Sequence, residues 1–268
     1  YKIERFQGGN MRYMMLVLSL LLFNTQIVAN DYSVRLMILK HSYEQMCNDD
    51  ANLAIAGLNE SKRNGLNANL IENKFTLNIS DFKSAIENKI KTNSKPRDTL
   101  IIFTIGHGFE SGQLQNLGQR STVMSVITKA SEKYNQKIIW WQLSCYAQAY
   151  LPKVSSLTAK QQSLFSVISS SFAYEPSPVG QQGRHMRQMF MALAKQSTFL
   201  DKDVSGNVST EELRTFLNLT DFDLGKRLYA KPNNIIFEKD RIILKIIDRN
   251  NSQGKYDENY FILPSNTK

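Results

Sequence analysis

The sequence has 268 residues, a formal net charge of +9 and two cysteines. This length suits one α/β domain with additions better than two full domains, and so few cysteines exclude a disulfide-rich scaffold. The basic residues are scattered along the chain rather than gathered on one helix, so we expect no nucleic-acid binding. The positive charge favours acidic surfaces or partners.

The N-terminal segment carries a targeting pattern. In residues 11–29, an arginine precedes an apolar run, and the segment ends on the small residue Ala29, which is typical of a secretory signal peptide. The run is too short to span a bilayer comfortably. We therefore expect an exported protein, periplasmic or secreted, without a stable membrane anchor. Residues 1–10 show no targeting pattern, and we expect them to be untranslated leader.

Apolar, β-rich runs then alternate with segments of helical periodicity, which indicates a mostly parallel sheet with helices on both faces. Asp49 or Asp50 is expected to cap the first helix, Gly65 to end it and Ser80 to cap the second. The expected strands cover residues 33–40, 69–77, 98–106, 137–145 and 163–171, and the expected helices cover 49–65, 81–90, 123–135 and 186–196.

Two residues that carry chemistry stand at the ends of two uninterrupted apolar strands, which should be central and buried on both faces. His107 follows the strand at 98–106, and Cys145 ends the strand at 137–145. Ligands gather at the carboxyl ends of parallel strands, which lie about 5 Å apart. The pattern therefore predicts a Cys/His dyad. The N–H groups of Gly108 and Cys145 would hold an oxyanion.

These segments resemble the caspase-like cysteine peptidases, which include caspases, metacaspases, legumains and clostripain-like enzymes. The resemblance rests on "IIFTIGHG", "IIWWQLSCYA", "MCNDDANLAIAGL" and "VGQQGRHMRQMFMALAKQSTFLDKDVSGNVSTEEL". It implies a three-layer αβα sandwich that hydrolyses protein or peptide substrates, with Cys145 as the nucleophile, His107 as the general acid/base and Gly108 as an oxyanion donor. The chemistry needs no cofactor. We expect one peptidase domain over residues 30–225, with the β-rich residues 226–268 packed on it.

The sequence departs from the family at two positions near the cysteine. Leu143 stands where many relatives have Asp or Glu, and Gln148 replaces a small residue. An apolar side chain cannot pair a buried cation, so Leu143 predicts weak selection for a basic substrate residue. Glu175 would supply the negative charge of the substrate-binding pocket in place of that acidic residue, or it is a solvated loop residue. These departures leave open an alternative, a catalytically weak or inactive caspase-fold protein that binds partners in response to calcium.

Residues 201–212, "DKDVSGNVSTEE", fit a calcium loop of the EF-hand type, with Gly206 at the sharp turn. We expect weak calcium binding, because the serine ligand adds no charge and no second complete loop is evident. The alternative is a helix-capping turn that binds no metal. The expected ligands are Asp201, Asp203, Ser205, Asn207 through its carbonyl, and Glu212.

Two further residues lie close to the first strand. We expect His41, which follows this strand, to be an exposed loop histidine. Cys47 is expected near the same edge of the sheet as Cys145, where it is either an inert thiol or the partner of Cys145 in a regulatory disulfide.

Overall fold

The computed structural model describes residues 33–93, 95, 98–147, 156–169, 183–194, 200, 207–208, 212–213, 216 and 263–264. The main strands are β1 (Val34–Lys40), β2 (Ala68–Phe75), β3 (Thr99–Ile105), β6 (Lys137–Leu143) and β7 (Phe165–Ser169). The helices are α2 (Gln45–Arg63), α3 (Ile79–Asn93), α4 (Arg120–Tyr134), α5 (Ala159–Leu164) and α6 (Gly183–Ala194). Two short antiparallel pairs join β4 (Gln113–Leu114) to β5 (Gly118–Gln119) and β8 (Asn207–Val208) to β9 (Leu263–Pro264).

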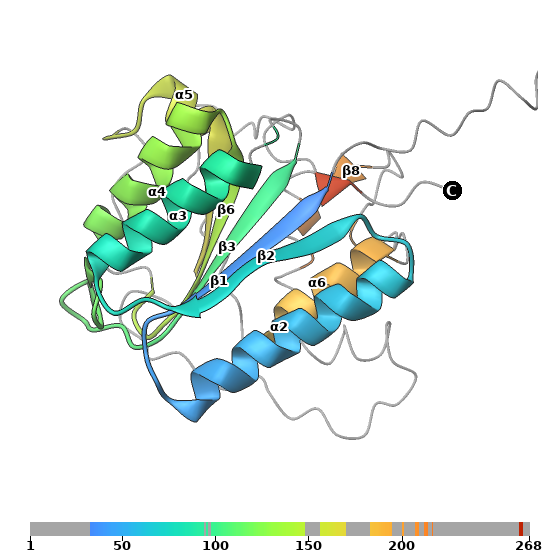
Figure 1. Ribbon diagram of the computed structural model, residues 1–268, viewed down its shortest axis with the longest axis horizontal. Helices are drawn as coiled ribbons and strands as arrows, with labels where there is room; N and C mark the ends of the chain where they lie inside the picture. Colours follow the sequence, from blue (N-terminus) through green and yellow to red (C-terminus); the bar gives the residue numbers. More distant parts are fainter. Residues whose placement is uncertain are drawn as a thin grey trace, which may run out of the picture. The chain divides into compact units, whose positions relative to one another are not determined.

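The main strands form a parallel sheet in the order β2-β1-β3-β6-β7 (Figure 1). Helices α3 and α4 cover one face of this sheet, and α2 and α6 cover the other. The predicted α/β class and the three-layer αβα architecture are therefore confirmed. The sequence placed the five strands of this sheet and the four long helices. It did not predict the short helix α5 before β7 or the two short antiparallel pairs.

Alternate side chains of each central strand enter opposite hydrophobic cores. Leu36 and Ile38 pack into the core on the side of α2 and α6, whereas Met37 and Leu39 pack into the core on the side of α3 and α4. All four side chains are fully buried. Because both faces are covered, the strands appear in the sequence as continuous apolar runs rather than as alternating ones.

The start of α2 differs from the prediction. The helix begins at Gln45, after Glu44 as the N-cap, so the expectation that Asp49 or Asp50 caps it is wrong. Asp50 lies inside α2 and is fully buried. Its carboxylate accepts a hydrogen bond from the N–H of Gly183 at 2.8 Å, and it thereby caps the start of α6 instead. A carboxylate stabilises a helix N-terminus because it satisfies an orphan donor there.

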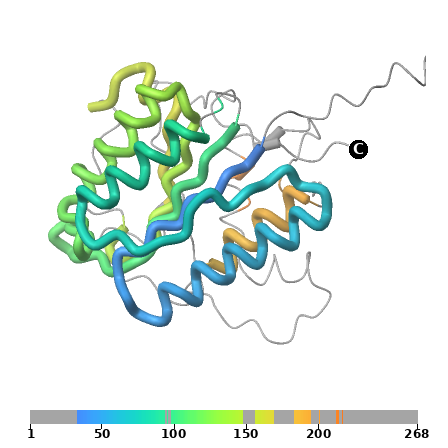
Figure 2. The backbone as a smooth tube through the Cα atoms, viewed as in Figure 1, coloured from blue at the N-terminus to red at the C-terminus, as the bar shows by residue number. Residues whose placement is uncertain are grey.

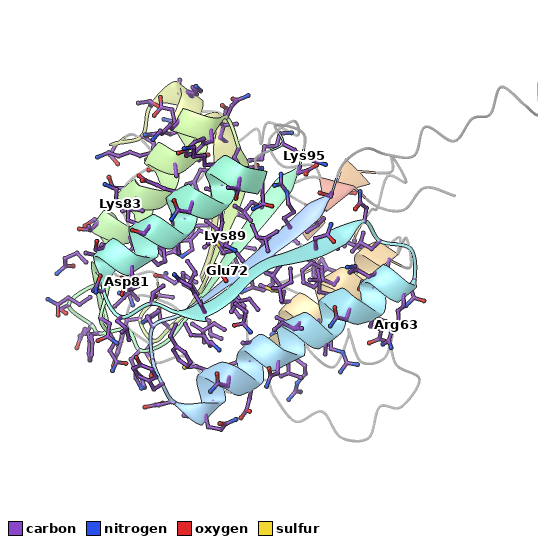
Figure 3. All side chains as sticks on the ribbon, viewed as in Figure 1. Arg63, Glu72, Asp81, Lys83, Lys89 and Lys95 are labelled. Carbon is purple, nitrogen blue, oxygen red and sulfur yellow. The ribbon has the colours of Figure 1, made fainter. Side chains whose placement is uncertain are left out.

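The start of α3 also differs from the prediction. The side-chain oxygen of Asn78 accepts a hydrogen bond from the N–H of Asp81 at 2.9 Å, so Asn78 is the capping residue rather than Ser80. Further along this helix, Lys89 forms an ion pair with Glu72 of β2 at 3.3 Å (Figure 3). This contact joins the helix to the edge strand of the sheet.

Helices α2 and α6 lie side by side on their face of the sheet (Figure 2). A Cβ atom built on Gly57 of α2 would overlap Arg187 of α6, so a glycine permits the close approach of the two helices. Among the residues with a described position, no helix is long and apolar enough to cross a membrane. The domain boundaries at residues 30, 225 and 226 stay predictions, since residues 1–32 and most of 226–268 lie outside the described part.

Candidate active site

The loops that carry His107 and Cys145 are in direct contact. Strands β3 and β6 are parallel neighbours, with Ile105 opposite Leu143, and the N–H of Gly106 donates to the carbonyl oxygen of Leu143 at 3.1 Å. A Cβ atom built on Gly108 would overlap the carbonyl oxygen of Cys145. The fold therefore brings together the two strand ends that the sequence singled out.

The backbone of Gly108 has a direction that suits an oxyanion donor. Gly108 faces Leu114 in an antiparallel bridge, and the hydrogen bonds on either side of it run from Phe109 N–H to Gln113 O at 2.9 Å and from Gln115 N–H to His107 O at 3.0 Å. In this antiparallel pattern the bridging residue makes neither bond, so its own N–H points away from the opposite strand. The N–H of Gly108 is thereby turned out of the hairpin.

Glu44 holds the imidazole of His107. Its Oε1 lies 2.5 Å from the Nε2 of His107, and the two side chains are 44% and 36% exposed. A carboxylate only accepts hydrogen bonds, so the contact requires a proton on Nε2 and leaves Nδ1 as the ring nitrogen outside this contact. The sequence analysis missed Glu44. The signal was present, because Glu44 follows the carboxyl end of β1, which is the neighbour of β3.

Gln142 and Arg120 fix the turn that carries Cys145. Gln142 is fully buried, and its Nε2 donates to the carbonyl oxygen of Ala147. Its Oε1 accepts from the Nε of Arg120 at 3.0 Å. Tyr146, directly after the cysteine, has a φ of 53°, which few non-glycine residues adopt without support from their surroundings. The turn is thus shaped by specific contacts, and sequence analysis had not selected either residue.

His41 is buried rather than exposed, so its expected position was wrong. Its side chain is 1% exposed and packs on Gly106, where a Cβ atom would overlap the imidazole ring. Nδ1 donates to the carbonyl oxygen of Gln115 at 3.0 Å. Burial lowers the pKa of His41 to about 3, and the nearby charges of His107 and Arg120 lower it further. His41 is therefore neutral at ordinary pH.

The two cysteines have different surroundings. Burial raises the pKa of Cys47 to about 11, which makes its thiol unreactive at neutral pH. Cys145 is half-buried, and the two residues are not bonded to each other.

The remaining predicted site residues are placed as follows. The side chain of Leu143 is 2% exposed and belongs to the core beneath α2 and α6. Asn207 pairs with Pro264 in the β8–β9 ribbon, and Glu212 has a helical conformation. Within the described ranges, no group of three or more His, Cys, Asp or Glu residues could hold a metal. The residues of this set that fall outside those ranges are Gln148, Glu175, Asp201, Asp203 and Ser205.

No protein-family model matches the sequence, and no curated protein matches it. Among solved structures, the chain is similar to caspase-1 from Spodoptera frugiperda, with 14% sequence identity and a TM-score of 0.44. The similarity covers 71% of this chain and 78% of the caspase chain. The roles of His107 and Cys145 therefore rest on the contacts within this chain.

Proposed function

We propose that this protein is an exported, caspase-like cysteine endopeptidase in which Cys145 and His107 hydrolyse peptide bonds. The observation that carries the proposal is the contact between the two strand-end loops, in which Gly108 packs against the carbonyl group of Cys145. A thiol and an imidazole on touching loops at the carboxyl ends of parallel strands are the elements of nucleophilic catalysis.

The proposed reaction has two halves. The Cys145 thiolate attacks the carbonyl carbon of the scissile bond, and the oxyanion that forms is stabilised by the N–H groups of Gly108 and Cys145. His107 then gives a proton to the leaving amine, the C–N bond breaks, and a thioester remains on the sulfur. In the second half, His107 takes a proton from water, the hydroxide attacks the thioester, and the acid product leaves as the thiolate is restored.

Glu44 has a supporting role in this reaction. Its hydrogen bond to Nε2 fixes the orientation of the His107 ring and stabilises the imidazolium form that gives its proton to the leaving amine and is restored when water is deprotonated. Because Glu44 accepts a hydrogen bond from the protonated Nε2, it also selects the tautomer of neutral His107 in which Nδ1 is the acceptor.

Digestion of a peptide library by the purified protein tests the proposal. We expect cleavage by the wild-type protein and none by Cys145→Ala, with both proteins giving the same circular dichroism spectrum. The alternative function, a calcium-responsive binding protein without peptidase chemistry, predicts no cleavage by either protein. It also predicts that iodoacetamide labels Cys145 no faster than the buried Cys47.

We further propose that the loop at residues 201–212 binds calcium. Two of its five expected ligands, Asn207 and Glu212, have described positions. The pairing of Val208 with Leu263 supports the proposal, because it ties the middle of the loop to a second segment of the chain. Glu212 has a helical conformation, as the last ligand of an EF-hand loop should. The bound ion would order the loop and take no part in the hydrolysis.

A further inference from the structure

Arg120 is a fully buried arginine at the base of the candidate active site. It is the first residue of α4. Both facts are unfavourable for a cation, because burial removes its hydration and a helix N-terminus carries partial positive charge. A charged side chain in such a place needs specific contacts to hold it there.

The hydrogen bonds of Arg120 reach both loops of the site. Nη1 donates to the carbonyl oxygen of Phe109, which lies on the His107 loop, at 3.4 Å. Nη2 donates to the carbonyl oxygen of Cys145 at 2.7 Å and to the hydroxyl of Ser144 at 3.4 Å. The planar, forked guanidinium group suits this task, since it presents several N–H donors in fixed directions.

Gly108 lies directly against this guanidinium group. A Cβ atom built on Gly108 would overlap Nη2 of Arg120 as well as the carbonyl oxygen of Cys145. The side chain therefore supports the peptide unit that would donate to the oxyanion, and it holds the carbonyl group of the nucleophile. A shift of either loop would break at least one of these contacts.

The charge of Arg120 also acts on the nucleophile. Burial lowers the pKa of Arg120 to about 10, and attraction to the Cys145 thiolate opposes this shift. Nη2 of Arg120 lies 2.7 Å from the carbonyl oxygen of the cysteine itself, so a positive charge stands close to this residue. Such a charge has a larger effect in a site with restricted water than it has in bulk solvent. Positive neighbours are the usual cause of thiol reactivity in proteins.

We propose that Arg120 is a positioning residue for the Cys145 nucleophile: it locks the two strand-end loops together and supplies positive charge that favours the thiolate, without contacting the substrate. This inference rests on the proposed role of Cys145 as the nucleophile. Full burial of Arg120 excludes direct contact with a peptide.

Several titratable groups lie on the elements around Cys145 and belong in any account of its pH dependence. Arg120 faces it from the start of α4, and His107 lies on the loop after β3. Glu44, before α2, is bonded to His107. His41, after β1, lies within electrostatic reach of both His107 and Arg120 and is neutral. Of these groups, Arg120 brings a permanent positive charge to the site.

The test is the pH dependence of iodoacetamide labelling at Cys145, followed by mass spectrometry of the labelled peptide in the full chain. The variants are Arg120→Met and Arg120→Lys, with Arg35→Met as a matched control that removes a buried arginine from the other end of the sheet. In Arg120→Met we expect the labelling rate at about pH 6 to fall about tenfold and the pH–rate profile to move to higher pH. Arg120→Lys keeps the positive charge but loses the forked guanidinium group, so its labelling rate should lie between those of Arg120→Met and the wild type.

A folded Arg120→Met protein with the wild-type profile would overturn the inference. If Arg120→Met does not fold, the test rests on Arg120→Lys. Wild-type labelling and wild-type peptidase activity in Arg120→Lys would overturn the inference. The same shift in Arg35→Met would also overturn it, because the effect would then be general destabilisation. Labelling does not require hydrolysis. An inactive wild-type protein whose labelling still depends on Arg120 would therefore refute the proposed function and retain this inference.

Discussion

The two ends of the central sheet each contain a buried arginine, and the two arginines have different surroundings. At the amino ends of the strands, Arg35 of β1 forms an ion pair with Asp98 at 2.9 Å, and Gln136 accepts a second hydrogen bond from it at 3.3 Å. At the carboxyl ends, the bonds described for Arg120 end on neutral oxygen atoms, including the carbonyl oxygen of Cys145 at 2.7 Å.

The pKa of each arginine shows which group its charge acts on. Burial lowers the pKa of both side chains. The charge that opposes this effect comes from the Asp98 carboxylate for Arg35 and from the thiolate form of Cys145 for Arg120. Asp98 is almost fully buried, so the first pair lies inside the protein, whereas Cys145 is only partly buried. The same residue type thus stabilises the fold at one end and prepares chemistry at the other.

The largest effect is expected when the reactive pair is removed. Cys145→Ala and His107→Ala should each lower kcat/KM for peptide cleavage by at least about 10⁴-fold, because a nucleophile and its acid/base act as one unit. For the same reason, the double variant should lose little more than either single variant. Cys47→Ala, which removes the buried thiol, is the control and should keep wild-type activity. Peptidase activity of Cys145→Ala within tenfold of the wild type would contradict the mechanism.

At the amino ends, the expected effect is on stability alone. Asp98→Ala leaves Arg35 buried without its counter-charge, which should cost about 3–5 kcal/mol of unfolding free energy in urea denaturation. Glu72→Ala is the control, because its ion pair with Lys89 is partly exposed and should contribute less than about 1 kcal/mol. The pH–rate profile of Cys145 labelling should not change in folded Asp98→Ala. If it did, the two ends of the sheet would be coupled, and the comparison would fail.

Lowering the pH should reduce the free energy of unfolding because of His41, which lies at the carboxyl ends of the strands. Its pKa in the folded protein is about 3, below the ordinary value of 6.5, so between these values the unfolded chain binds a proton that the folded protein excludes. Stability should therefore fall as the pH falls below 6.5, by up to about 1.4 kcal/mol per pH unit. The measurement is urea denaturation of the wild type and of His41→Gln at several pH values. The variant should show the shallower slope, and equal slopes would contradict the burial of a neutral imidazole.

A smaller effect is expected from Glu44. Glu44→Gln keeps the shape of the side chain but removes the charge that stabilises the His107 imidazolium, so kcat should fall about tenfold while KM changes little. Glu110→Gln is the matched control, because Glu110 is an exposed carboxylate on the same loop as His107. Equal kinetics for the two variants would remove Glu44 from the mechanism.

The smallest effect is expected from calcium, outside the central sheet. With a dissociation constant on the order of 10⁻⁴ M, calcium at about ten times that concentration should stabilise the protein by about 1.4 kcal/mol. The melting temperature should rise by about 2–4 °C. Glu212→Gln should remove most of this rise, and magnesium at the same concentration is the control. An unchanged melting temperature in millimolar calcium would reduce the loop to a capping turn.

The sequence predicted the sheet, and it singled out the strand ends at His107 and Cys145, because both depend on local patterns. Continuous apolar runs mark strands that are covered on both faces, and His107 and Cys145 each follow such a run. Helix starts were less predictable, since several polar residues compete for each cap. Asn78 caps α3 in place of Ser80, and Asp50 is used by α6 rather than by its own helix.

By itself, the sequence determined the α/β class, the order of the main elements and the strand ends at which His107 and Cys145 stand, because hydrophobic periodicity and strand-end position are properties of neighbouring residues. Only the tertiary structure decided the partners of these residues. Glu44 reaches His107 across 63 positions of the chain, and Arg120 reaches Cys145 across 25. Such contacts, like the burial of His41, arise when parallel strands bring their loops to one edge of the sheet. No local pattern encodes which side chains then meet.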